Sequence, residues 1–192
     1  MITNLFEKNI IKVLSFFLIS PGSRYKRIEI KEKTQMNNIP LDIALRKLKS
    51  LKFIEENKNL YLLNFKVEEN KEIFELISEE YKSLNLPYKI FNILVEISDK
   101  LSRIQELKSV ILFGSYAKLI HTEKSDIDLA IILENKLKNE QKTEKRIEQE
   151  IAKISKNYQK QIELHFYKQR DIEHNKSDPI IKDILRNSKK IF

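Results

Sequence analysis

Apolar side chains recur at intervals of three and four residues in five stretches of this 192-residue chain. That spacing places them along one side of an α-helix, so each stretch predicts an amphipathic helix. Breaker residues support two of the boundaries, with Ser20-Pro21-Gly22 after the first helix and Leu86-Pro87 after the third. The five predicted helices span residues 5–19, 41–51, 68–84, 88–107 and 137–158.

Shorter apolar runs have the length of β-strands. Residues 53–56 and 60–63 flank Asn57-Lys58-Asn59, which is typical of a β-hairpin. The run Ser109–Phe113 is bounded by Gly114 and predicts a buried strand. Residues 126–133 and 161–166 predict two more strands. In the last of these, alternation places Ile162, Leu164 and Phe166 inward and Gln161, Glu163 and His165 on the opposite face.

The first 66 residues resemble a winged helix-turn-helix domain. The order is a helix at 5–19, a second helix in the short mixed segment at 28–34, a turn at 36–40, the basic helix at 41–51 and the hairpin. The stretch LDIALRKLKSLKFIEENKNLYLLN, from residue 41 on, resembles the recognition helix and wing of that family. The resemblance implies that DNA contacts come from Arg46, Lys47 and Lys49 on the helix and Lys58 on the wing. A merely solvated face, or a protein or dimer contact, stays open as an alternative.

The charge distribution sharpens this picture. Net charge is +8, and residues 1–66 carry 13 Lys and Arg against 6 Asp and Glu, whereas residues 67–192 carry 23 against 22. A basic segment joined to a nearly neutral one indicates that the first segment meets a polyanion, such as duplex DNA.

The composition indicates in which cellular compartment the protein is expected. The chain has no cysteine, so disulfides are excluded and an intracellular protein is expected. Its longest apolar run, residues 10–19, contains Lys12 and Ser15 and is too short to span a bilayer. We therefore expect a soluble, cytoplasmic protein.

The pattern that carries chemistry lies between residues 111 and 132. A strand ends at Gly114-Ser115, and after ten intervening residues Asp126-Ile127-Asp128 opens a second strand. Glycine lets a phosphate approach the backbone, and Ser115 is expected to cap the following turn and leave amides facing an anion. Strand periodicity points both aspartates to one face, where a divalent cation would offset their mutual repulsion.

This combination resembles the nucleotidyltransferase superfamily that includes DNA polymerase beta, and within it the minimal nucleotidyltransferases. The resemblance covers residues 99–192. It implies that Gly114, Ser115 and Lys118 bind nucleotide phosphates, that Asp126 and Asp128 bind Mg²⁺ or Mn²⁺, and that Glu163 is the third catalytic carboxylate. Family members usually carry Arg-Gly where this chain has Lys118-Leu119, so the forked phosphate contact is lost.

The implied activity is transfer of a nucleoside monophosphate from an NTP, with ATP the first expectation, to a hydroxyl of a protein or an RNA. Resemblance to the minimal enzymes suggests an antitoxin beside a HEPN-domain toxin. A second hypothesis is a DNA-binding transcriptional regulator whose nucleotidyltransferase half senses nucleotide or is degenerate. The three histidines lack metal-ligand spacing, which favours ordinary surface roles for His121, His165 and His174.

The expected fold class is therefore α+β. We expect a winged helix-turn-helix domain at 1–66, linker helices at 67–98 that also offer a homodimer seam, and a nucleotidyltransferase domain at 99–192. The last would have a small mixed sheet flanked by helices. Its final helix is expected to begin with Asp178 as N-cap and Pro179 in the first position.

Overall fold

The computed structural model describes residues 6–137 and 139–191. The chain forms two compact units that divide between Val95 and Glu96. Both combine helices with a small sheet, so the predicted α+β class is confirmed. Among the described residues, no helix is long and apolar enough to cross a membrane.

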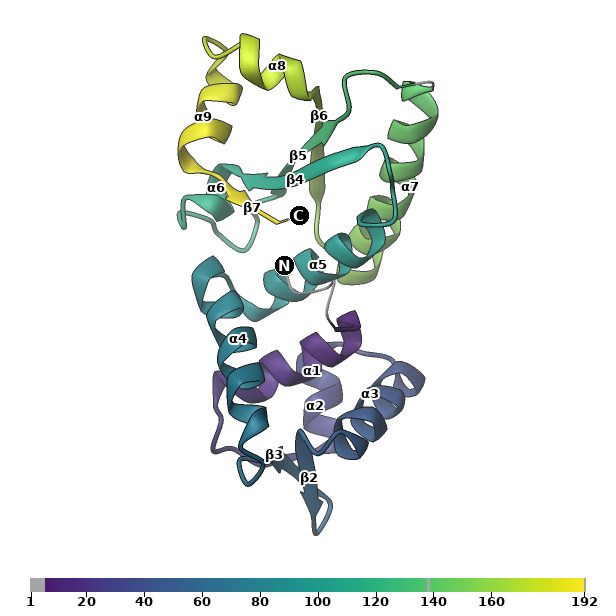
Figure 1. Ribbon diagram of the computed structural model, residues 1–192, viewed down its shortest axis with the longest axis vertical. Helices are drawn as coiled ribbons and strands as arrows, with labels where there is room; N and C mark the ends of the chain where they lie inside the picture. The colour runs from purple at the N-terminus through teal and green to yellow at the C-terminus, as the bar shows by residue number, and fades with distance from the viewer. Residues whose placement is uncertain (1–5, 138, 192) are drawn as a thin grey trace. The chain divides into compact units, whose positions relative to one another are not determined.

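The first unit consists of helices with a three-stranded antiparallel sheet of order β1-β3-β2, and the hairpin of β2 and β3 lies at one end of the unit (Figure 1). Helix α5 begins in this unit and continues into the second. In chain order the elements are α1 (Lys8–Ile19), β1 (Tyr25–Lys26), α2 (Arg27–Thr34), α3 (Asn38–Ser50), β2 (Ile54–Asn57), β3 (Leu60–Leu63), α4 (Glu69–Leu84) and α5 (Tyr88–Leu101).

The predicted basic helix and hairpin are confirmed. In α3 one face is buried, and it consists of the four residues that the spacing selected: Leu41, Ala44, Leu45 and Leu48. The hairpin turns through Lys58 and Asn59, whose φ angles are 50° and 63°. Two successive positive φ angles match the right-handed twist of the paired strands.

One prediction in this unit is wrong. Residues 36–40 are not a turn, because α3 already begins at Asn38 and Pro40 lies in its first turn. Proline is tolerated there because the first N–H groups of a helix have no partner within it. The second helix, predicted at 28–34, is confirmed as α2. It is stabilised at its start by the Glu29 carboxylate, which accepts from the N–H of Lys26.

The second unit is built on a four-stranded sheet of order β6-β5-β4-β7. Strands β5 and β6 are parallel and the other pairs are antiparallel, which confirms the predicted small mixed sheet. After α5 the elements are β4 (Leu107–Phe113), α6 (Gly114–Ala117), β5 (Ile127–Leu133), α7 (Glu140–Tyr158), β6 (Ile162–Lys168), α8 (Gln169–His174), α9 (Pro179–Asn187) and β7 (Lys189–Lys190).

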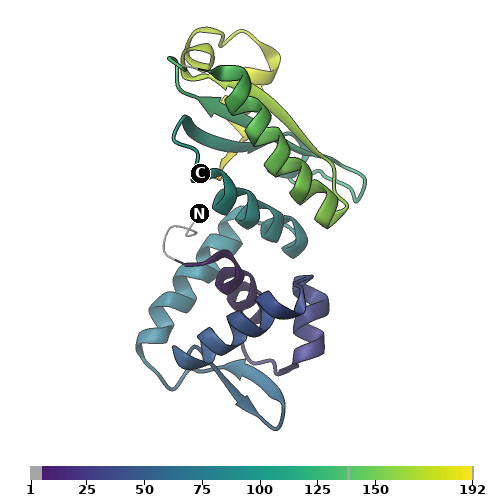
Figure 2. The same ribbon diagram turned by 90° about the vertical axis from the view of Figure 1, so that its right-hand side faces the viewer.

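Helices cover the sheet on both sides (Figures 1 and 2). Helix α7 lies along one side, and the apolar face predicted for it is buried: Ile147, Ile151, Ile154 and Tyr158. On the other side α8 and α9 pack against β4, β5 and β6. The cluster there contains Phe113, Ala130 and Ile132 from the sheet and Ile184 from α9.

The end of α5 differs from the prediction. The helix stops at Leu101 and not at residue 107, because Leu107 already pairs with Leu133 at the start of β4. Ile104 keeps the helical apolar spacing, but it is buried in the connecting turn. Apolar spacing alone does not distinguish a buried residue in a helix from a buried residue in the turn that follows. Helix α8 and the short strand β7 have no counterpart in the sequence prediction.

The start of α9 follows the sequence prediction. Oδ1 of Asp178 accepts hydrogen bonds from the N–H groups of Ile180 and Ile181 at 2.8 and 3.1 Å, and Pro179 is the first helical residue. This cap fixes where α9 begins, and therefore which of its side chains meet the sheet.

Candidate active site

Gly114 joins β4 to α6 in a conformation that suits glycine. Its φ is +70°, and a Cβ at this position would lie 2.1 Å from Oδ2 of Asp128. The sequence predicts a glycine here to admit a phosphate. The structure adds a second requirement, because the space that a side chain would fill is already taken by a carboxylate.

Ser115 does not cap the turn. Strand β4 runs directly into α6, so Phe113 is the N-cap and Ser115 is the second residue of the helix. The prediction of Ser115 as N-cap is therefore wrong, since no residue separates the strand from the helix. Ser115 is partly buried, and its carbonyl accepts the N–H of Ile120 at 3.0 Å.

Strand pairing brings two carboxylates together. Asp128 on β5 lies opposite Phe113 on β4 and opposite Glu163 on the parallel strand β6. Residues directly opposite in adjacent strands project to the same side of a sheet. Asp128 and Glu163 therefore project to the same side of the sheet, which α8 and α9 cover further along the strands. Gly114, which follows the end of β4, lies at the same edge of the sheet as these two acids.

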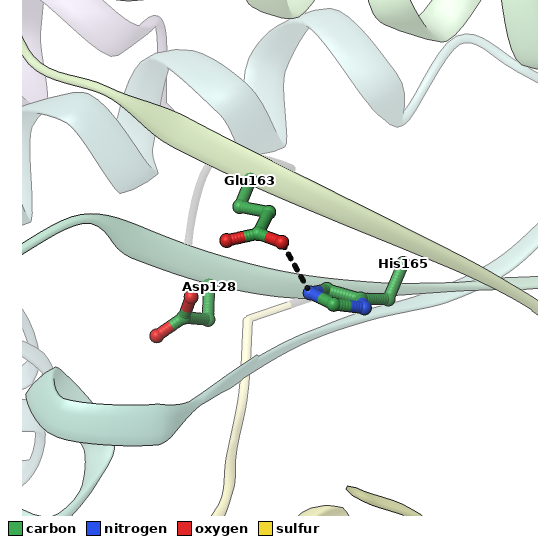
Figure 3. Close-up of side chains that lie close together, drawn as sticks. All are labelled: Asp128, Glu163 and His165. Carbon is green, nitrogen blue, oxygen red and sulfur yellow. Dashed lines mark ion pairs between the residues drawn. The ribbon is translucent and has the colours of Figure 1, made fainter.

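His165 completes a cluster with these two acids. One ligand atom from each of Asp128, Glu163 and His165 lies within 4.8 Å of the others, and His165 Nε2 is 3.4 Å from Oε1 of Glu163 (Figure 3). The imidazole ring packs edge-on against Phe113, with the ring centres 5.2 Å apart. Sequence reasoning missed His165 as a site residue. The available signal was its position two residues after Glu163 on one strand face.

The cluster carries unbalanced negative charge. Burial raises the pKa of Asp128 above its ordinary value, and the neighbouring Glu163 raises it further. His165 acts in the opposite direction, and Asp126 and Asp183 add smaller increases. A carboxylate whose ionised form is disfavoured by burial and by other carboxylates is stabilised when a cation binds beside it. Two carboxylates and an imidazole are donors that divalent metals accept.

Asp126 lies outside this cluster. It precedes the first residue of β5 and is partly buried, and its charge reaches Asp128 strongly enough to raise the pKa of that carboxyl. The acids that pair across the sheet are thus Asp128 and Glu163, while Asp126 lies at the strand entrance. Its role as a second metal ligand stays a prediction.

The arrangement can be compared with known proteins. The family model described as "Polymerase beta, Nucleotidyltransferase" matches residues 95–192, half of the chain. The chain belongs to this nucleotidyltransferase family. A comparison with curated proteins found no match. The matched residues include β4, α6, β5 and β6, so the glycine turn and the carboxylate cluster both lie in the nucleotidyltransferase region.

The Lys118-Leu119 pair, where nucleotidyltransferases usually carry Arg-Gly, has a structural consequence. Leu119 has a φ of +61°, so this chain holds a leucine in the left-handed conformation that glycine adopts without strain. Lys118 Nζ is 2.7 Å from Oδ1 of Asp183 on α9. The lysine therefore lies beside the turn, with its charge engaged by a carboxylate.

The other two histidines have different surroundings. His121 stacks on the buried ring of Tyr116, with ring centres 4.3 Å apart, and its Nδ1 is buried. His174 is exposed on α8, where its Nδ1 lies 2.7 Å from the carbonyl oxygen of Arg170. Neither belongs to the cluster around Asp128.

The predicted DNA-contacting residues lie in the first unit. Lys47 forms an ion pair with Glu7, and Lys49 forms one with Glu56. Arg46 donates from Nε to the carbonyl oxygen of Asp42 at 3.3 Å, and Lys58 is at the tip of the hairpin. Two of the four cations are thus partly neutralised by neighbouring acids.

Proposed function

We propose that this nucleotidyltransferase moves a nucleoside monophosphate from an NTP to a hydroxyl of a protein or an RNA. The observation that carries the proposal is the pairing of Asp128 with Glu163 across β5 and β6, beside the turn at Gly114. Family membership supports nucleotidyl transfer in general. The acceptor and the choice of ATP among NTPs belong to the proposal.

In this proposal Asp128 and Glu163 hold Mg²⁺ or Mn²⁺, with Asp126 as a further ligand at the strand entrance and His165 beside Glu163. The donor set fits such an ion, because the ligand atoms converge within 4.8 Å and the Asp128 carboxylate lacks a neighbouring lysine or arginine in the described cluster. A bound divalent ion would neutralise triphosphate charge and polarise the phosphoryl oxygens.

The residues around the cluster have separate tasks. The Gly114 N–H and the Lys118 ammonium bind phosphate oxygens, and Ser115 lies beside them in α6. Glu163, whose side chain is 55% exposed, accepts the proton of the acceptor hydroxyl. The acceptor oxygen then bonds to the α-phosphorus, the bond from that phosphorus to the β-phosphate oxygen breaks, and pyrophosphate leaves.

A labelling experiment tests this function. The protein is incubated with Mg²⁺ and cell lysate and with each of the four NTPs, labelled on the α-phosphate in one series and on the γ-phosphate in another. We expect the α-label to appear on a macromolecule and the γ-label to leave as pyrophosphate. Asp128→Asn should abolish transfer with the fold intact, whereas Glu173→Gln, which removes an exposed charge on α8, should not. Undiminished transfer by Asp128→Asn would refute the assignment.

The acceptor class is the least constrained part of the proposal. A protein hydroxyl on a HEPN-domain toxin, with this chain as its antitoxin, is the first candidate that the family resemblance suggests. Ribonuclease or protease treatment of the labelled product separates RNA from protein acceptors.

A second function is supported by the first unit. The order α1, α2, α3 and hairpin, with β1 as third strand, supports a winged helix-turn-helix domain at residues 1–66. Under this proposal α3 enters a major groove, and Arg46 and Lys58 contribute more than Lys47 and Lys49, because the latter pair with acids.

The test is duplex DNA binding as a function of salt. Arg46→Ala with Lys58→Ala should lower the salt dependence by about one phosphate contact for each residue removed. Lys47→Ala with Lys49→Ala is the matched control and should have a smaller effect. The absence of any shift of duplex DNA by the wild-type protein at low salt would eliminate this function.

A further inference from the structure

The carboxylate of Asp183 lies where the proposed function expects phosphate. Its Oδ1 is 2.7 Å from Nζ of Lys118, and the nearby backbone N–H of Gly114 helps to hold its pKa below the ordinary value. Gly114 is the first residue of α6 and Lys118 directly follows its last, whereas Asp183 comes from α9, far later in the chain. The Lys118 ammonium is thus already paired with one anion, beside the Gly114 turn.

The Asp183 carboxylate and a nucleotide phosphate cannot both use the full charge of Lys118. The Asp183 charge also acts beside the Gly114 N–H, where the proposed function expects a phosphate oxygen. Lysine has three hydrogens, but a carboxylate at 2.7 Å offsets much of the charge that a phosphate would use. The Asp183 charge also acts on Asp128, which places it within electrostatic reach of the proposed metal site.

The position of Asp183 is fixed by its helix. Helix α9 is capped by Asp178 and buries Ile181 and Ile184 on either side of Asp183 in the sequence. Nδ2 of Asn187, one turn later, donates to Oδ1 of Asp183 at 2.9 Å. The carboxylate is therefore held at the turn, and the side chain can leave only by rotating while the helix stays in place.

We propose that Asp183 occupies the Lys118 ammonium beside the Gly114 turn in the nucleotide-free protein, and that an incoming NTP must displace it. Asp183 thereby sets the NTP affinity of this chain. This inference rests on the proposed function, since it takes Gly114 and Lys118 as phosphate ligands. A residue that merely ties α9 to α6 would act in the opposite direction, because its loss would disorder the turn and weaken binding.

The test is calorimetric binding of ATP and of inorganic tripolyphosphate, each with Mg²⁺, to the full chain, which requires no acceptor. Asp183→Asn keeps the shape and the hydrogen-bond acceptor but removes the charge. It should tighten both ligands by about fivefold, because the binding-competent state no longer has to be released from an ion pair. Glu173→Gln makes the same change of net charge on α8 and should leave both affinities unchanged. Circular dichroism and the melting temperature confirm that each variant is folded.

A double-mutant cycle locates the effect. In a Lys118→Met background the gain from Asp183→Asn should fall by at least about half, because the ammonium that Asp183 withholds is gone. The inference is overturned if Asp183→Asn binds ATP no better than wild type, if Glu173→Gln tightens binding equally, or if the full gain persists without Lys118. If wild type and all variants fail to bind ATP and tripolyphosphate with Mg²⁺ or Mn²⁺, the proposed function fails and this inference with it. Wild-type binding without a gain in Asp183→Asn refutes this inference alone.

Discussion

Replacing Gly114 with alanine tests the contact on which the site geometry depends. At a φ of +70° an alanine is strained by about 1–2 kcal/mol. The added Cβ would also lie 2.1 Å from Oδ2 and 2.9 Å from Cγ of Asp128, so the carboxylate has to rotate away. That movement costs less than a backbone clash, because the end of a side chain can shift. We expect a total loss of about 2 kcal/mol in the free energy of unfolding.

The assay is thermal and urea unfolding followed by circular dichroism, with Mn²⁺ binding measured on the same samples. A loss of this size corresponds to a melting temperature lower by roughly 10 °C for a unit of about 100 residues. Gly22→Ala is the matched control: a Cβ there meets no atom within 4 Å, and its φ is not positive, so we expect little change. In an Asp128→Ala background the cost of Gly114→Ala should fall to about 1 kcal/mol, because only the backbone strain remains.

Mn²⁺ affinity should fall with Gly114→Ala even if the stability loss is small, since Asp128 must leave its position. The reasoning is refuted if Gly114→Ala matches wild type in both melting temperature and Mn²⁺ affinity. That result would mean that the glycine is neither left-handed nor in contact with the carboxylate.

Three further predictions address the same unit. The raised pKa of Asp128 means that the folded protein binds the carboxyl proton more tightly than the unfolded chain does. The protonated carboxyl therefore contributes to stability below the ordinary pKa of 3.8, and this contribution is lost as the pH rises through the pKa of the folded protein. Metal-free Asp128→Asn should therefore unfold at higher urea than wild type at pH 7, and the difference should vanish in acid; a constant difference would contradict this. Leu119→Gly should be about 1 kcal/mol more stable than Leu119→Ala, because both lose the side chain and only glycine relieves the positive φ; equal urea midpoints would disprove the strain. Asp178→Ala should cost about 1 kcal/mol by removing the cap of α9, measured by the same unfolding; an unchanged midpoint would show that the cap is not formed.

Local patterns predicted much of the fold. Helical spacing identified the buried face of α3 and of α7, and Asp178-Pro179 identified the start of α9. The predicted helix boundaries were wrong where one sequence pattern is compatible with two structures. Pro40 resembles a turn residue but is equally suited to the first turn of a helix, and Ile104 continues a helical spacing although the helix has ended.

The site was predicted in part, because its composition depends on strand register. The Gly-Ser and Asp-x-Asp pattern directed attention to β4 and β5, but only the parallel pairing of β5 with β6 decides that Glu163 lies opposite Asp128. The same pairing places His165, two residues after Glu163 on β6, in the cluster with Asp128 and Glu163. The contact of Asp183 with Lys118 joins distant parts of the chain, and no spacing in the sequence predicts it.

The central claim is that Asp128 and Glu163 form one divalent-metal site beside the Gly114 turn. Titration of Mn²⁺ into the nucleotide-free protein, followed by the loss of its free electron paramagnetic resonance signal, tests this directly. We predict that Asp128→Asn and Glu163→Gln each weaken Mn²⁺ binding by roughly tenfold or more, while Glu173→Gln binds as wild type does. Wild-type Mn²⁺ affinity in Asp128→Asn and Glu163→Gln would contradict the claim.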